Sequence, residues 1–405
     1  MMNQLGSTLH WRWLLAAPHR AMFFLGALQL LLVMLPWAAE MLARLTGQSL
    51  PWSWPPGWWH ALLAIDGVFP FFVFGFLLTA MPRWQGYGDL PAGVFVRPWG
   101  VLVAGWTLIY ASALLPVLRL PGMALVFAGW AWLLVMLAPI AFRAGNGRLH
   151  AVPAWLATVA GLAGWGAWMG FAATGDGAWA RAAIDVGVWG FLLPVFFTVS
   201  HRMIPFFSSA VLDDYTAFRP PWALFMMLGA AVGHGVLMLL GEAQLTWLVD
   251  LPAAGLAVFL TVRWGLVRSF EVPLLAMLHL GFMWLGLALA LFGVQSLAAW
   301  QGSTVLGLAP LHALGIGMFT VIALGMVSRV TLGHSGQALR ADATTWRLCW
   351  AVQAVAVVRM LAELWTSAQA VLLVLAAVGW LVAFGFWARR YMPVYLRPRA
   401  DGRPG

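Results

Sequence analysis

Nine histidines supply most of the side chains in this 405-residue chain that could bind a metal ion or a cofactor. Two of them, His60 and His312, open long apolar stretches, and small residues follow each at helical spacing. Such a strip leaves room for a flat ring, and imidazoles from two helices can be the axial ligands of a b-type haem. The alternative is interhelical hydrogen bonding, worth about 0.6 to 2 kcal/mol each. His60 and His312 are therefore candidate metal ligands and cofactor-binding residues.

A second candidate metal site lies in the stretch 272–294. His279 is followed four residues later by Met283, which places both side chains on one helical face. Imidazole and thioether together are a donor set that suits copper(I). The same spacing also arises by chance in a chain with 19 methionines. His234, between two glycines, is better explained as a packed polar residue.

The remaining histidines lie near arginines at helix ends. His201 precedes Arg202, and His334 lies in a Gly-His-Ser-Gly turn, so both are candidates to line a polar mouth, with helix capping as the alternative. A further charged pair, Arg359 and Glu363, is four residues apart and predicts an ion pair inside the bundle. By contrast, we expect three histidines to be solvated: His10, His19 and His150.

Long apolar stretches must position these side chains. Each is long enough to cross a hydrocarbon layer of about 30 Å as a helix. There are twelve of them, at residues 20–39, 60–81, 98–118, 120–141, 151–172, 182–202, 221–240, 243–263, 272–294, 305–327, 347–365 and 369–389. The sequence therefore predicts an all-α integral membrane protein with twelve transmembrane helices. We expect a single domain over residues 1–390, including a cytoplasmic segment 1–19, and a cytoplasmic tail 391–405.

Arginine distribution fixes the expected orientation. All 22 positive residues are arginines, and 18 of them fall in alternate loops or the terminal segments on one side. Three fall on the other side, and Arg359 lies within a helix. Positive loops stay in the cytoplasm, so both termini are predicted to be cytoplasmic.

Composition excludes several classes of protein. With 63% hydrophobic and 9% charged residues, the chain is not a soluble globular domain, and lipids must surround it. Its arginines form no basic stripe, so we expect no nucleic-acid partner. The lone Cys349 excludes an intramolecular disulfide and a covalently attached c-type haem. The first apolar stretch lacks a cleavage site and is expected to be a retained helix.

One internal regularity concerns the second, sixth and tenth stretches. Each carries a polar residue and, 17 positions later, an arginine: Asp66 and Arg83, Asp185 and Arg202, His312 and Arg329. Seventeen helical residues rise about 25 Å, so each pair brackets the membrane. The pattern hints at a pseudo-threefold arrangement of four-helix units; coincidence is the alternative, because arginines commonly end inward-running helices.

Several segments together resemble the NnrS family. The most specific is the region that begins at Leu311-His312-Ala313-Leu314-Gly315 and continues through Gly325–Arg329 to Leu332–Gly336. Three others agree in order: Gly75–Ala80 with Pro82 and Trp84, Arg202–Phe207, and Leu278–Gly281. The family comprises bacterial inner-membrane proteins with twelve helices that contain haem and copper and respond to nitric oxide. Haem-copper oxidases and nitric oxide reductases are a looser analogy.

The resemblance implies haem b, copper and nitric oxide as cofactors and partner, in denitrification or nitrosative stress. It singles out His60, His279, His312 and His334, with Arg202 and Arg329 as cofactor-binding residues that hold haem propionates or a small anion. One departure is that the family's His-Ala-His-Glu is here His60-Ala61-Leu62-Leu63, which puts a metal site in doubt.

Three functions stay open on the sequence alone. The first is a haem protein that binds, senses or processes nitric oxide, with or without redox catalysis. The second is a cofactor-free transporter of a small solute or metal-nitrosyl species that uses Asp66 and Asp185. The third is an assembly factor for a respiratory complex.

Overall fold

A computed structural model describes residues 9–401, and every regular element in that part of the chain is helical. The α-helices are α1 (Trp11–Leu14), α2 (Pro18–Leu32), α3 (Met34–Leu45), α4 (Pro56–Leu62), α5 (Phe69–Trp84), α6 (Ala92–Ala111), α7 (Arg119–Ala141), α8 (Arg148–Thr174), α9 (Gly177–Asp185), α10 (Leu193–Ser209), α11 (Pro221–Leu239), α12 (Trp247–Arg263), α13 (Leu266–Ser269), α14 (Pro273–Trp300), α15 (Ala309–His312), α16 (Val321–His334), α17 (Ala343–Leu364) and α18 (Gln369–Tyr395). Short 3₁₀ turns are η2 (Pro116–Leu118), η4 (Ala243–Leu245) and η6 (Thr366–Ala368), and π-helical segments are η1 (Leu63–Val68), η3 (Val186–Leu192) and η5 (Ala313–Thr320).

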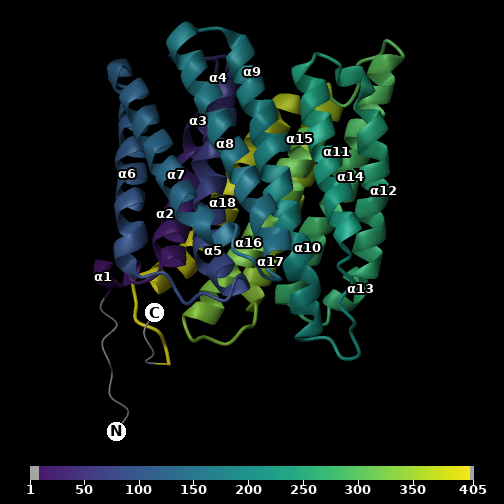
Figure 1. The fold of residues 1–405 in the computed structure, drawn as a ribbon. Helices are drawn as coiled ribbons and strands as arrows, with labels where there is room; N and C mark the ends of the chain where they lie inside the picture. The colour runs from purple at the N-terminus through teal and green to yellow at the C-terminus, as the bar shows by residue number, and fades with distance from the viewer. Residues whose placement is uncertain (1–8, 402–405) are drawn as a thin grey trace.

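The long helices run side by side as one bundle (Figure 1). Within the described residues, ten helical segments are long and apolar enough to cross a membrane, which confirms a multi-pass membrane protein. The other two predicted stretches, 243–263 and 347–365, also form helices. However, α12 has only 17 residues, and α17 carries Arg359 and Glu363. The full count of twelve crossings stays a prediction.

The two ends of the described chain meet. The backbone N–H of His10 donates to the carbonyl of Leu396 at 2.9 Å, and Arg20 Nη1 donates to the carbonyl of Arg397 at 2.7 Å. Helix α1 therefore lies beside the end of α18, at the lower edge of the bundle in Figure 1. Both ends share one side of the bundle. Residues 1–8 of the predicted N-terminal segment, and Arg403 in the predicted tail, lie outside the described residues.

Three continuous helical rods share a feature that the sequence did not predict. The rods are α4–η1–α5, α9–η3–α10 and α15–η5–α16. Each contains a π-helical segment: η1 includes Asp66, η3 directly follows Asp185, and η5 directly follows His312. A π turn holds more residues than an α turn and is often found at functional sites. In η5 the hydroxyl of Thr320 donates to the carbonyl of Gly315, five residues earlier, at 2.8 Å, which gives that buried carbonyl a partner.

These three rods meet at the centre of the bundle. The rings of Phe69, Phe196 and Phe319 contact one another, with centroids 5.0 to 5.9 Å apart. Beside them lies an apolar cavity of about 40 Å³ between α5, α10 and α16. The three wide turns and this convergence agree with three equivalent four-helix units, which stay a prediction.

Two expectations were wrong. His19 and His150 are only 2% and 3% exposed, because α2 and α8 begin earlier than the apolar stretches and carry these residues into the packed bundle. The stretch 98–118 was also displaced, since α6 runs from Ala92 to Ala111. Pro98 lies inside this helix, and the chain leaves the helix before Pro116, which cannot continue it.

Candidate functional site

His60 and His312 lie at one small cavity, although they are 252 positions apart in the sequence. His60 belongs to α4 and His312 ends α15, so each imidazole stands just before the π-helical segment of its rod. The cavity has a volume of about 30 Å³ and is lined mainly by apolar side chains of α3, α17 and α18. Residues from the first two and the last three of the predicted apolar stretches thus converge at this cavity.

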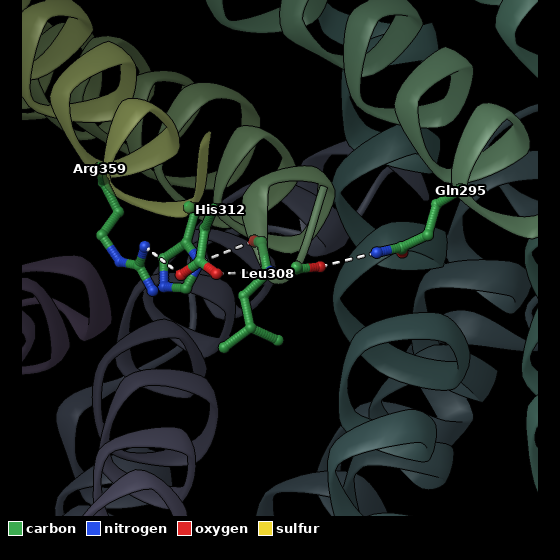
Figure 2. Close-up of polar contacts among 6 residues, drawn as sticks. Gln295, Leu308, His312 and Arg359 are labelled. Carbon is green, nitrogen blue, oxygen red and sulfur yellow. Dashed lines mark hydrogen bonds and ion pairs between the residues drawn. The ribbon is translucent and has the colours of Figure 1, made fainter. Parts of the chain in front are cut away.

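The ring of His312 has a fixed tautomer. Its Nδ1 lies 2.9 Å from the carbonyl oxygen of Leu308, and a carbonyl can only accept, so Nδ1 carries the proton. The Nε2 lone pair is then left free for another group. Figure 2 shows His312 beside Leu308, which is joined in turn to the ion pair of Arg359. A hydrogen bond from the second ring nitrogen to a backbone carbonyl is the usual way to orient a metal-binding histidine.

His60 is held by stacking. Its ring lies 4.2 Å from that of Trp37, centroid to centroid, with 17° between the planes. The Nδ1 atom is buried and makes no hydrogen bond with any residue that the structure describes. A buried polar atom without a partner costs about 1 to 3 kcal/mol. This imidazole therefore keeps an unused nitrogen at a site where a ligand would lower the free energy.

The predicted ion pair of α17 is confirmed, and it lies at the same cavity. Arg359 Nη1 is 2.6 Å from Glu363 Oε1, and the two side chains are 8% and 13% exposed. The other carboxylate oxygen, Oε2, accepts the backbone N–H of Leu308 at 3.2 Å. Sequence reasoning missed that Arg359 lines the cavity of His60 and His312, although it stood out as the one arginine within a predicted span.

The turn that carries Leu308 is conformationally demanding. Leu306 and Gly307 both have positive φ, 67° and 47°. A non-glycine residue with positive φ is uncommon and costly. A Cβ on Gly307 would overlap the Oε2 atom of Glu363. The carboxylate of α17 and the tight turn before α15 therefore fit together only with glycine at this position.

The predicted cytoplasmic group lies apart from this cavity. Arg202 stacks over Trp84 at 4.8 Å, and Arg329 over Phe207 at 4.0 Å, measured to the ring centroids. Seventeen residues separate His312 from Arg329, a rise of about 25 Å in a helix. These arginines therefore do not share a site with His60 and His312. Arg359, by contrast, lines the same cavity as His60 and His312.

His334 ends α16, on that same far side. Its ring is 4.6 Å from that of His19, centroid to centroid, and its carbonyl accepts a hydrogen bond from Arg399. Nearby, Arg83 Nε donates to Asp89 at 2.9 Å, and this hydrogen bond lowers the pKa of the Asp89 carboxyl. Sequence reasoning did not foresee the contact with His19, because it treated that residue as solvated.

The candidate copper pair does not form a common site with further donors. His279 is 1% exposed, and its Nε2 lies 3.0 Å from the hydroxyl oxygen of Ser208, whereas Met283 is 38% exposed on the outside of the bundle. Among the described residues, no group of three or more His, Cys, Asp or Glu side chains is arranged to hold a metal ion.

Comparison with known proteins gives one result. The sequence model of the NnrS family, described as NnrS protein, matches residues 13–399, nearly the whole chain. None of the curated proteins matches.

Proposed function

Because the chain belongs to the NnrS family, a group of membrane proteins of the nitric oxide response, we propose that it binds haem b between His60 and His312. The observation that carries this proposal is the convergence of two imidazoles from distant helices on one cavity. Each has a ring nitrogen that is not used in a hydrogen bond. Two such imidazoles, from His60 and His312, would hold the iron of a b-type haem.

The donor set fits this group. The hydrogen bond from Nδ1 of His312 to Leu308 orients the ring and makes its Nε2 a better donor. Arg359 offers a guanidinium that pairs with a propionate, while Glu363 keeps its charge compensated when no propionate is present. Haem would supply an iron centre able to bind nitric oxide.

The space between His60 and His312 does not yet fit a haem. The cavity, at about 30 Å³, is far smaller than the roughly 300 to 1,000 Å³ of ordinary ligand pockets. Trp37, stacked on His60, fills the position beside the imidazole. Haem binding therefore requires the Trp37 ring to move aside, so this residue is expected to respond to cofactor loading.

Copper is not part of this proposal. Leu62 and Leu63, which replace the family's His and Glu, are 1% and 4% exposed and pack in the apolar core. His279 is already hydrogen-bonded to Ser208, and Met283 lies on the outer surface. Neither location offers a set of donors directed at one point.

The test is the absorption spectrum of detergent-purified protein from haem-replete cells, oxidised, reduced and exposed to nitric oxide, with a pyridine haemochrome assay. We expect about one haem b per chain, lost in His60→Ala and in His312→Ala. His279→Ala is the matched control, a buried histidine of another helix, and should retain haem. A folded but colourless wild-type protein would contradict the proposal and favour the transporter that depends on Asp66 and Asp185.

The proposal includes the membrane topology. Twelve crossings of the bacterial inner membrane, with both ends in the cytoplasm, are supported by the contact between His10 and Leu396 and by 18 arginines on one side. The three π-helical rods support the pseudo-threefold arrangement of four-helix units. Reporter fusions after Gly47 and after Gly88 test the topology: activity of a periplasmic reporter is expected only at the first.

A further inference from the structure

A second cavity lies on the other side of the turn that carries Leu308. It has a volume of about 320 Å³ and is enclosed by α9, η3, α11, α14 and the turn itself. Figure 2 shows Gln295 reaching this turn from one side while Arg359 and His312 stand on the other. The volume lies within the range of small-molecule sites, roughly 300 to 1,000 Å³. The turn is therefore a wall shared by the two cavities.

An imidazole–carboxylate dyad borders this cavity. His234 Nδ1 is 2.7 Å from Asp250 Oδ1, and the two side chains are 2% and 1% exposed. A carboxylate accepts a hydrogen bond, so the neutral imidazole carries its proton on Nδ1 and keeps a lone pair on Nε2. The ring is fixed by stacking on Trp189, with centroids 3.4 Å apart. His234 was expected to be a packed polar residue, and its tautomer and orientation are now defined.

Two other polar groups of the cavity are also acceptors. Gln295 donates through Nε2 to the carbonyls of Val305 and Gly307, at 3.0 and 2.7 Å, so its Oε1 remains to accept. Asp185 makes no hydrogen bond or ion pair with a residue that the structure describes, although Arg181 is a charged neighbour one turn earlier. His234, Gln295 and Asp185 thus each offer an acceptor, and none of them offers a free donor.

The rest of the wall is apolar and partly aromatic. Trp189 and Phe292 contact each other at 5.0 Å, centroid to centroid, and Leu308 and Leu311 close the side toward His312. Most of these residues belong to membrane-spanning rods. A complementary ligand therefore has an apolar, flat body and carries hydrogen-bond donors.

We propose that this cavity binds the head group of a hydroquinone, with one phenolic O–H donating to Nε2 of His234. A hydroquinone combines a flat apolar ring with two O–H donors, which match the acceptors that His234, Gln295 and Asp185 offer. The oxidised quinone offers only carbonyl acceptors, so it would leave the acceptors of the cavity without donors. Binding stands independently of haem. Its position beside α15, and hence beside an electron acceptor, rests on the proposed function.

Ligand binding can be measured by equilibrium dialysis of a short-chain hydroquinone against detergent-purified protein. We expect saturable binding of one molecule per chain, at least about tenfold tighter than its dimethyl ether, which has the same ring but no donor. The oxidised quinone should bind as weakly as the ether. Equal affinity for hydroquinone and dimethyl ether would overturn the proposal.

Variants locate the site. His234→Leu should lower hydroquinone affinity by at least about tenfold, and Asp250→Asn should lower it without changing the size of the side chain, because the tautomer of His234 is then no longer fixed. His279→Leu is the matched control and should bind as the wild type does. Wild-type affinity in both His234→Leu and Asp250→Asn would overturn the assignment.

Cation binding is the competing outcome. A wall with three acceptors, one of them the carboxylate of Asp185, also suits a cation, so tetramethylammonium and Zn²⁺ are titrated in the same assay. If either binds at this cavity and hydroquinone does not, the proposal is wrong. Haem content, measured on the same samples, separates the two proposals: a colourless protein that binds hydroquinone refutes only the haem site.

Discussion

Two histidine pairs at opposite ends of the bundle show what proximity of imidazoles means. His150 and His201 are bonded directly, with Nε2 and Nδ1 3.0 Å apart, and His201 Nε2 donates to the carbonyl of Pro220 at 3.1 Å. His60 and His312 share a cavity, yet no hydrogen bond joins them among the described contacts. The first pair uses three of its four ring nitrogens in bonds to each other and to the backbone, whereas each ring of the second pair keeps a nitrogen that makes no hydrogen bond.

What distinguishes two histidines that only stabilise the fold from two that can bind a metal ion is the number of free nitrogen lone pairs, more than the distance between the rings. Because the carbonyl of Pro220 only accepts, His201 carries its proton on Nε2, and His150 must donate from its own Nε2. Only one nitrogen, the buried Nδ1 of His150, then lacks a partner. A single donor is a poor metal site, while two donors from different helices can ligate one iron.

The largest expected difference between the two histidine pairs is in haem content. His312→Ala should remove all bound haem, because one axial nitrogen and the link to Leu308 disappear together, whereas His201→Ala should retain the wild-type haem content. Pyridine haemochrome assays on both purified variants measure this difference. Haem loss in His201→Ala alone would reverse the assignment of the two pairs.

The ion pair beside His312 gives the next largest effect. Glu363→Ala leaves the guanidinium of Arg359 buried without its partner, and we expect a loss of about 3 to 5 kcal/mol in the free energy of unfolding. Asp89→Ala removes an exposed partner of Arg83 and should cost no more than about 1 kcal/mol. Denaturation in detergent measures both, and equal costs would show that Arg359 is reached by water.

The two histidine pairs should also differ in how much each contributes to the free energy of unfolding. In His201→Ala the Nε2–H of His150 loses its acceptor inside the bundle, so unfolding should become easier by about 1 to 3 kcal/mol. His60→Ala removes no hydrogen bond of Nδ1 and should cost less in the haem-free protein. The order of the two denaturation midpoints is the measurement, and the reverse order would mean that His60 is bonded through water.

The smallest effect concerns the turn before α15. Gly307 and Gly302 both have positive φ, 47° and 81°, so alanine at either position carries a backbone cost. Only at Gly307 does the added Cβ also meet Glu363. Gly307→Ala should therefore be less stable than Gly302→Ala by about 1 to 3 kcal/mol. Equal midpoints would show that the Glu363 side chain moves away freely.

Much of the fold follows from hydropathy, but the helix ends do not. Each predicted stretch falls on a helix, since about 20 apolar residues have few other solutions in a membrane. Helix α16 nevertheless continues past the predicted end at residue 327 to His334, because Arg329 stacks on Phe207 and stays 7% exposed. The charge of Arg329 suggested that the helix ends there, but in the structure this arginine packs on Phe207 and the helix continues.

The candidate site was predictable only in part. His60 and His312 could be named from their small neighbours and from the family resemblance, and the structure brings them to one cavity. The role of Glu363 at Gly307 could not be inferred, because it depends on contact between helices that the sequence does not encode locally. The dyad of His234 and Asp250 was likewise missed, since their 16-residue separation spans two helices and a turn.

The π-helical turns have a consequence for how the protein tolerates insertions and deletions. Each residue of an α-helix advances the chain by about 100° around the axis. Removing one residue from η5 would let that wide turn close to ordinary α geometry, so α16 would keep roughly its present orientation relative to His312. The π turn therefore absorbs a single-residue deletion, whereas the same deletion inside the regular helix α16 would rotate every later residue of that helix by about 100°.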